Sequence, residues 1–308
     1  MATTTSMTST YAGEAAGQYI AAALFSGVTL GSNAITIKPN IKYKQVVKKL
    51  ALSGLLQDAS CDFTDAGTVT LTERIIEPKE LMMNVTLCKS DFDSDWEAIS
   101  MGYSAFDNLP PNFQSFLIAE MGAVIAEGTE TSIWMGATGT SGQFDGLVTL
   151  MLADSTVVDS PNDTVTSTNV IAELTTTVDL IPARVRNAPD LTFYVAPNIY
   201  YAYSRALGGF VATIGGAGYK DEGSVNLKPL MFEGIPMFIA EGLSSNYAVV
   251  AQKSNLWFGT GLLSDQNEIK IIDMADIDGS KNVRFVARYT AAVQYGIGSE
   301  IVLYAPAH

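Results

Sequence analysis

Three aspartates at alternate positions, Asp91, Asp93 and Asp95, form the pattern in this sequence that comes nearest to a chemical site. Carboxylates with this spacing begin a calcium-binding loop, which also needs Gly at its sixth position and a bidentate Glu at its twelfth. Those positions hold Trp96 and Gly102 here. The pattern therefore favours the first turn of a helix, where acidic side chains are stabilised by the helix dipole, over a calcium site.

Most other catalytic chemistry lacks its residues. The single histidine, His308, argues against Ser-His-Asp triads, Cys-His pairs and histidine-ligated zinc. The glycine runs at 208–209 and 215–218 are not followed by Gly-Lys-Ser/Thr, so they predict loops and not phosphate sites. The acids at 273–278 leave a carboxylate-dependent hydrolase open, although nothing marks a catalytic pair. We therefore predict no catalytic residue, no metal site and no cofactor, and expect that the protein is not an enzyme.

The charge of the chain is concentrated in one block. The 308 residues include 18 Lys and Arg against 32 Asp and Glu, for a net charge of −14. Residues 90–183 contain fourteen acidic residues and no basic one, so this block accounts for the whole excess. Such a balance argues against binding nucleic acid by charge and against docking on anionic membranes. Five lysines cluster earlier in the chain: Lys38, Lys42, Lys44, Lys48 and Lys49.

Few residues are charged at all. The charged fraction is 16%, against about 25% in typical soluble domains. We therefore expect that part of the surface is hidden, including against copies of the same chain. The charge-free stretch 15–37 is long enough to cross a bilayer, but Gln18, Ser26 and Asn33 interrupt it. We interpret it as a helix and loop, and predict no membrane partner.

Alternation of apolar and polar residues predicts a long β-hairpin. Residues 35–52 and 68–76 both alternate, and the polar stretch 57–67 between them is rich in turn residues. The two arms contain too few bulky side chains to form a core of their own. Because a lone two-stranded ribbon is marginally stable, we expect the hairpin to lie on another surface.

A long helix is predicted for residues 111–135. Apolar residues recur at helical spacing, Pro111 suits the first turn, and Gly136 suits the end. A helix of this length is roughly 37 Å long at about 1.5 Å per residue. Three of its acids have no lysine within the helix, which predicts an acidic face toward solvent: Glu120, Glu127 and Glu130.

The second half of the sequence is mostly strand. Helices are predicted at 170–181 and 197–207, with a strand at 191–195 between them. Asp278-Gly279 predicts a hairpin turn. Further strands are predicted at 236–240, 247–251, 256–258, 268–274, 283–295 and 300–304. Long helices followed by a mainly antiparallel set of strands indicate an α+β fold and not alternating βαβ units.

The order of these parts resembles the major capsid protein of tailed bacteriophages, which has the Hong Kong 97-type shell fold. The resemblance covers nearly the whole chain, although no single motif in it is specific. The segments that carry it are 82–87 with 91–99, 113–136 with 143–147, 174–186, 191–207, 232–237 and 283–304.

The resemblance implies a division of the chain into parts with separate tasks. Residues 1–40 would be an N-terminal arm, and residues 41–80 an extended loop that reaches across a neighbouring subunit. Residues 81–146 and 266–308 would form a peripheral domain with the long spine helix. Residues 147–265 would form an axial domain.

The resemblance also implies the function and the partners. The chain would be a structural subunit that assembles into hexamers and pentamers of an icosahedral or prolate phage head. That head would enclose double-stranded DNA without binding it specifically, and would be built in the host cytoplasm as part of the virion. A portal, a separate scaffolding protein and a decoration protein are the implied partners. An encapsulin-like compartment of the same fold and a soluble acidic hydrolase are the alternatives.

Candidate residues follow from this implied function. The acidic face of the long helix, with Glu120, Glu127 and Glu130, would line the interior and repel packaged DNA. The basic cluster would meet acids of neighbouring subunits. The candidate subunit-interface residues are Lys38, Lys42, Lys44, Lys48, Lys49 and Arg74.

Overall fold

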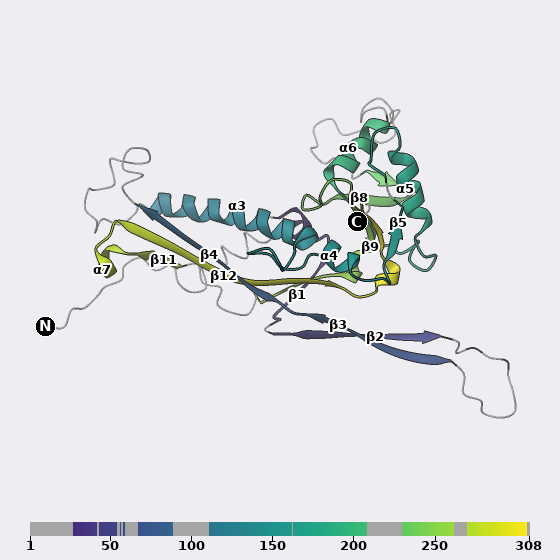
Figure 1. The fold of residues 1–308 in the computed structure, drawn as a ribbon, viewed down its shortest axis with the longest axis horizontal. Helices are drawn as coiled ribbons and strands as arrows, with labels where there is room; N and C mark the ends of the chain where they lie inside the picture. The colour runs from purple at the N-terminus through teal and green to yellow at the C-terminus, as the bar shows by residue number, and fades with distance from the viewer. Residues whose placement is uncertain are drawn as a thin grey trace.

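The structure is a computed structural model of the chain. It describes residues 27–41, 43–53, 56, 58, 67–88, 111–161, 163–207, 230–261 and 270–306. Residues 15–26 of the charge-free stretch, the helix start predicted at Asp91, the glycine runs at 208–218 and Lys42 lie outside these residues. Figure 1 shows an elongated molecule with α3 (Pro111–Met135) along one sheet, a second sheet at the other end, and a projecting hairpin.

The first sheet is organised by β12 (Asn282–Tyr295), a strand of 14 residues. Along one edge it pairs antiparallel with β4 (Lys79–Cys88). Along its other edge it pairs first with β11 (Lys270–Asp273) and then with β10 (Leu256–Thr260), both antiparallel. β1 (Thr36–Pro39) adds to β10 in parallel and completes the five strands. β12 thus joins every other strand of the sheet except β1.

α3 covers one face of this sheet. Alternate residues of β12 are buried, including Phe285 at 1% exposure and Tyr289 at 8%, as expected for a strand with one covered face. The Tyr289 hydroxyl lies 3.3 Å from Thr129 Oγ1, so the buried face is the one toward α3. The short helices α2 (Val28–Gly31) and α4 (Leu147–Leu152) contribute Leu30 and Leu147 to this core.

Residues 28–39 are part of this body. Leu30 in α2 and Ile35 beside β1 are 2% and 0% exposed. The predicted arm, residues 1–40, therefore contains a segment that packs into the core.

The second sheet has six strands and its own core. The order is β5-β13-β9-β6-β8-β7, and the pairs β5–β13 and β6–β8 are parallel. α5 (Val170–Asp179) and α6 (Pro197–Ala206) pack against it through Leu174, Val178 and Ile199. The strands are β5 (Val158–Ser160), β6 (Leu191–Val195), β7 (Met231–Phe232), β8 (Ile235–Ile239), β9 (Ala248–Gln252) and β13 (Val302–Tyr304).

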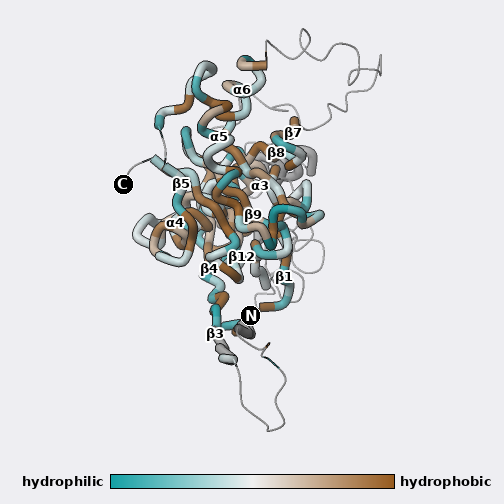
Figure 2. The backbone as a smooth tube through the Cα atoms, turned by 90° about the vertical axis from the view of Figure 1, so that its right-hand side faces the viewer, coloured by the Kyte–Doolittle hydropathy of each residue, from teal (hydrophilic) through white to brown (hydrophobic). Residues whose placement is uncertain are grey.

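The hairpin consists of β2 (Gln45–Ser53) and β3 (Thr68–Ile76), which pair only with each other. Their register runs from Gln45 opposite Ile76 to Ser53 opposite Thr68. Nine residues per strand give a ribbon roughly 30 Å long at about 3.3 Å per residue. Figure 2 shows the hydrophobic residues gathered around β9 and β12, with the hairpin leaving this body.

Much of the predicted secondary structure is confirmed. The helix at 111–135 and the strand at 191–195 have the predicted bounds, and the hairpin is present. The mixed α+β class is also confirmed. The mainly antiparallel arrangement of the second half is confirmed, and the pairs β1–β10, β5–β13 and β6–β8 are parallel.

Asp278-Gly279 lies in the connection between the antiparallel strands β11 and β12, as predicted for the turn of a hairpin. This connection contains the one-turn helix α7 (Ala275–Asp278), and Gly279 follows it with a φ of 73°. No helix in the described part of the chain is both long and apolar enough to cross a membrane.

Two glycines provide a matched test of this packing. A Cβ on Gly242 would lie 2.1 Å from the backbone oxygen of Glu130, whereas one on Gly128 would meet nothing within 4 Å. Gly242→Ala should lower the free energy of unfolding by about 1–3 kcal/mol through overpacking. Gly128→Ala in α3 should raise it by about 0.5–1 kcal/mol. Urea unfolding of the soluble subunit measures both; equal effects would contradict the packing of α3 on the 240–243 loop.

Candidate subunit interface

The hairpin has two exposed apolar side chains near its root, where it leaves the body of the protein. Val46 and Ile75 lie opposite each other in the register and are 45% and 47% exposed. The next pair on the same face is charged, because the register places Lys48 opposite Glu73, two residues from Val46 and Ile75. The apolar stripe of the hairpin therefore consists of Val46 and Ile75 across the two strands, which their own chain leaves exposed.

Two of the predicted interface lysines are paired within the same hairpin. Lys44 Nζ lies 2.8 Å from Glu77 Oε2, and Lys48 Nζ lies 3.6 Å from Glu73 Oε1, its cross-strand partner. The hydrogen bond from Lys44 to Glu77 raises the pKa of Lys44. These pairs are exposed, and such pairs contribute little to stability. Lys44 and Lys48 thus each have a carboxylate partner in their own chain, and their contact with a neighbouring subunit stays a prediction.

The other candidate lysines lie in different settings. Lys38 Nζ lies 3.8 Å above the centre of the Trp257 ring, and burial lowers the pKa of Lys38. Lys49 lies in β2, but its side chain is outside the described atoms, as is the whole of Lys42. The three lysines of the cluster whose side chains are described thus each have a different partner within the chain.

Arg74 is directed into its own chain at the root of the hairpin. Its guanidinium donates to Asp154 Oδ2 and lies 4.6 Å above the Tyr295 ring. The Tyr295 hydroxyl donates to the same Asp154 oxygen at 2.8 Å, and Thr156 N donates to Asp154 Oδ1 at 2.9 Å. Burial alone raises the pKa of Asp154, but these three donors outweigh it and hold the pKa well below its usual range. Asp154 and Tyr295 thus contact the Arg74 side chain within its own chain, and its role as an intersubunit contact stays a prediction.

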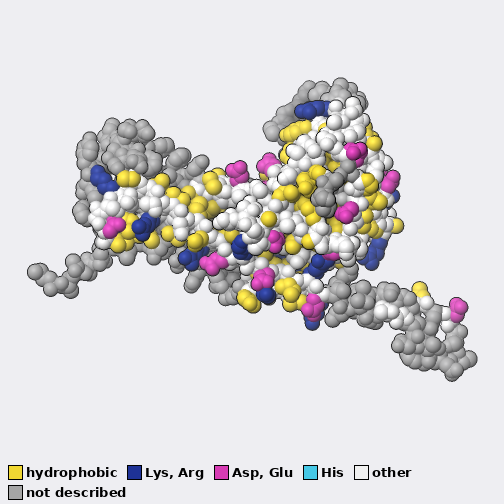
Figure 3. Space-filling view, in the orientation of Figure 1, with side chains coloured by type: hydrophobic (Ala, Val, Ile, Leu, Met, Phe, Trp, Pro, Cys, Tyr) yellow, Lys and Arg dark blue, Asp and Glu magenta, His cyan; other side chains and the backbone are white. Residues whose placement is uncertain are grey.

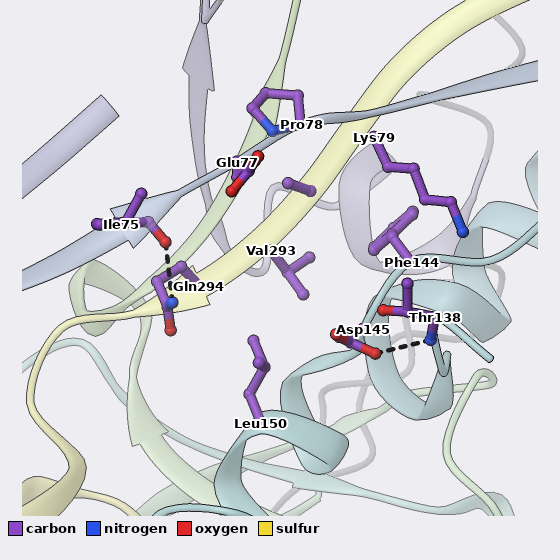
Figure 4. A pocket seen from close by; sticks show the side chains of 11 residues that line it. Ile75, Glu77, Pro78, Lys79, Thr138, Phe144, Asp145, Leu150, Val293 and Gln294 are labelled. Carbon is purple, nitrogen blue, oxygen red and sulfur yellow. Dashed lines mark hydrogen bonds between the residues drawn. The ribbon is translucent and has the colours of Figure 1, made fainter. Parts of the chain in front are cut away.

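A cavity of about 520 Å³ lies beside this root. Figure 4 shows its walls, which come from the β3–β4 junction, the loop after α3, α4 and β12. Lys79 Nζ donates to the Gln143 carbonyl at 2.7 Å, and Thr138 N donates to Asp145 Oδ1 at 2.7 Å. The remaining wall is largely apolar, with Leu150 and Val293. Among the described residues, no group of three or more His, Cys, Asp or Glu is arranged to hold a metal ion.

The predicted acidic face of α3 is reduced to one described side chain. Glu127 is exposed, the side chain of Glu120 lies outside the described atoms, and Glu130 is only 6% exposed. Glu130 precedes Trp134 by one helical turn and shares its buried side. Glu130 is therefore no part of an exposed acidic face. On the face shown in Figure 3, acidic and basic side chains are interspersed.

Thr29 explains how the Glu130 carboxylate is tolerated in the core. Thr29 N donates to Glu130 Oε2 at 3.0 Å, and the Thr29 hydroxyl donates to Oε1. Trp134 Nε1 in turn donates to the Thr29 hydroxyl at 2.9 Å. Burial raises the pKa of Glu130 more than these hydrogen bonds lower it. Thr29, Asp154 and Tyr295 have no sequence signal for these roles, because each partner lies 80 or more residues away.

Replacement of Glu130 by glutamine tests this arrangement. Because the folded pKa is raised, the stability contribution of Glu130 is present at acidic pH and is lost as pH rises through that pKa. Glu130→Gln retains two hydrogen bonds with Thr29 without a buried charge, since its amide oxygen accepts from Thr29 N and its amide nitrogen donates to the Thr29 hydroxyl. It should therefore increase the free energy of unfolding at pH 7 and remove this pH dependence. Glu127→Gln, on the exposed side, is the control and should change little.

Thr29→Val tests the other half of the same network. It should lower the free energy of unfolding by about 1–3 kcal/mol, because Glu130 and Trp134 each lose a partner. Denaturant titrations between pH 4 and pH 8 measure all three variants. A Glu130→Gln variant that is less stable at pH 7 and keeps the wild-type pH slope would contradict the assignment.

Comparison with known proteins finds similarity in solved structures and not in sequence. No family model and no curated protein matches the sequence. A chain of Gordonia phage Cozz matches with a TM-score of 0.59 and 12% identity, over 92% of this chain and 87% of that one. A chain of the satellite phage P4 procapsid matches with a TM-score of 0.56 and 13% identity, over 93% and 97%. A chain of the virus-like particle from Pyrococcus furiosus matches with a TM-score of 0.53 and 9% identity, over 94% and 96%.

Identities this low establish the fold and leave the task of the protein to be argued from its own residues. The matches span nearly the full length of both partners in each comparison. The chain therefore has the mixed α+β fold of phage capsid proteins.

Proposed function

We propose that the protein is the major capsid protein of a tailed bacteriophage, with the Hong Kong 97-type shell fold. The observation that carries this proposal is the fold similarity to phage chains such as those of Cozz and the P4 procapsid, over 92% and 93% of the chain. Its copies assemble into hexamers and pentamers of an icosahedral or prolate head around double-stranded DNA. The protein is assembled in the host cytoplasm and remains in the virion. Its task is structural and not enzymatic.

The hairpin supports assembly as the task of this fold. Val46 and Ile75 are exposed apolar side chains on a ribbon that pairs with no other strand. Burying such side chains stabilises a contact by about 1.5–3 kcal/mol for each one fully covered. A neighbouring copy is the surface that a repeated, closed assembly supplies to every hairpin.

The two cores support the division into domains. The first core joins α3 to the β12 sheet, and the second joins α5 and α6 to the β6 sheet. We assign the first to the peripheral domain, proposed as 81–146 and 266–308, and the second to the axial domain, proposed as 147–265. These bounds need adjustment, since α4 and β10 lie in the first core and β13 lies in the second. The extended loop is residues 41–80. We place the arm in residues before 28, since residues 28–39 are packed in the body.

Partners beyond the chain itself follow from the same proposal. A portal, a separate scaffolding protein and a decoration protein are the partners of such a shell. Glu127, with Glu120, remains the proposed acidic lining that keeps DNA from adhering.

One observation favours a second candidate of the same fold. The virus-like particle from Pyrococcus furiosus matches over 94% of this chain and 96% of its own. An encapsulin-like compartment that holds protein cargo is therefore the alternative. Nothing among the described residues favours the carboxylate-dependent hydrolase.

Assembly through the hairpin can be tested at Val46 and Ile75. The double variant Val46→Asp and Ile75→Asp should fold but lose at least about tenfold of its assembled fraction, because two carboxylates cannot be buried unpaired. Val46→Leu with Ile75→Val keeps the stripe apolar and is the control that should assemble. Negative-stain microscopy and light scattering, with and without a scaffolding protein, measure both.

Two outcomes would contradict these proposals. Shells from the aspartate variant at the wild-type yield would exclude this stripe as an assembly surface. A wild-type protein that forms no shells, hexamers or tubes under any condition would count against the capsid proposal itself.

The content of purified particles separates the phage shell from the compartment. Particles from infected or induced cells should contain double-stranded DNA that is protected from nuclease. The measurement is the ratio of absorbance at 260 and 280 nm, followed by gel analysis of released nucleic acid and protein. An enclosed enzyme without DNA would favour the encapsulin-like alternative.

A further inference from the structure

Three chain crossings between the two sheets meet at one place. Among the described residues, the chain passes between the sheets at 152–158, at 252–256 and at 295–302. Val158 N donates to the Ile301 carbonyl at 3.1 Å, which joins the first crossing to the third. The side chain of Asn255 accepts from Gly296 N and Ile297 N, at 3.1 and 2.8 Å, which joins the second to the third. We call these three segments the junction.

The junction is tightly packed as well as hydrogen-bonded. A Cβ on Gly298 would lie 2.3 Å from Thr156 Oγ1 and 3.1 Å from Asp154 Oδ2. The first and third crossings therefore touch without room for a methyl group. A change in the angle between the two sheets has to move these segments against each other.

Arg74 connects the hairpin to this junction. Asp154, its ion-pair partner, lies in the first crossing, and Tyr295, whose ring it covers at 4.6 Å, begins the third. The Tyr295 hydroxyl donates to Asp154, so the three side chains form one cluster. An arginine is suited to such a position because its planar guanidinium can pair with a carboxylate and stack on a ring at once.

A second set of contacts holds the root of the hairpin in place. Ile76 and Ile41 pack with Ala292, and the Cβ position of Gly259 lies 2.8 Å from both isoleucines. We call this apolar cluster the pivot. Arg74 lies two residues further out along β3, so its contact with Asp154 fixes the direction of the hairpin from that pivot. The cavity beside Ile75 and Glu77 leaves space at the root next to the pivot (Figure 4).

We propose that Arg74 is a positioning residue that couples the direction of the hairpin to the angle between the two sheets. Rotation of the hairpin must either break the contacts of Arg74 with Asp154 and Tyr295 or move these two residues with it. Because they belong to the first and third crossings, both crossings then move as well. In a shell, a neighbour that holds the hairpin thereby sets the bend of the subunit, and with it the local curvature. This last step rests on the proposed capsid function, whereas the coupling within one chain does not.

Hydrogen exchange on the soluble subunit tests the coupling. Arg74→Ala should speed amide exchange about tenfold or more in residues 153–158 and 295–301, on the two crossings that Arg74 links. Lys48→Ala is the matched control, because its ion pair with Glu73 lies on the hairpin and touches no part of the junction. It should leave both crossings at the wild-type rate.

Two further variants keep the test decisive if Arg74→Ala fails to fold. Arg74→Lys retains a charge for Asp154 without the planar group over Tyr295, so its exchange rates should fall between those of wild type and Arg74→Ala. Tyr295→Phe keeps the ring and removes the bond to Asp154, and should speed exchange mainly in 153–158. Acceleration confined to the hairpin in all of these variants would overturn the proposal.

Particle diameter tests the consequence for curvature. Where wild type gives one narrow diameter, Arg74→Ala should give a broadened distribution or a second size, and Lys48→Ala should not. Identical diameters for Arg74→Ala and wild type would overturn the link to curvature. If wild type forms no particles, the capsid function fails, and the exchange experiment still decides the coupling.

Discussion

The rest of the structure depends on the packing of the buried Trp134 side chain. Its side chain is fully buried near the end of α3, and its ring lies 5.2 Å from that of Tyr194 in the second sheet. Its Nε1 donates to Thr29, and Tyr194 in turn donates to the Ala34 carbonyl at 2.6 Å. One side chain thus fixes the long helix, the second sheet and the segment that precedes β1 to one another. Removing a buried Trp typically costs about 3–5 kcal/mol, and here the loss would fall on three elements together.

Local signals explain which features could be predicted from the sequence. The bounds of α3 follow from Pro111, the helical spacing and Gly136, and those of β6 from a short apolar run between turn residues. The spacing of Glu130, one turn before Trp134, is consistent with a buried position. The lack of a lysine partner within the helix instead led to the prediction that the Glu130 side chain faces solvent. Side-chain contacts between residues distant in sequence could not be predicted. Arg74 and Asp154 are 80 residues apart, and Thr29 and Glu130 are 101 apart. Arg74 has its partner Asp154 within the chain, and its contact with a neighbour stays a prediction.

The acidic block from 90 to 183 does not act as a single surface. Asp154 accepts a hydrogen bond from Arg74 at the root of the hairpin, and Glu130 accepts one from Thr29 in α2. Glu173 accepts one from the Tyr304 hydroxyl, at 3.2 Å, in the second core. These carboxylates are hydrogen-bond acceptors within the fold. A net charge therefore says less about partners than the number of charges that remain exposed after folding.

The place of β13 in the second sheet has a consequence for biosynthesis. Val302–Tyr304 lies between β5 and β9, and all three of its residues are buried. The sheet is therefore left with a gap until a segment made after every other described strand has emerged from the ribosome. A chain released before that point has the hairpin and the long helix but an open second sheet. Only a chain that includes residues 302–304 can complete the hydrogen bonding of β5 and β9 in this sheet.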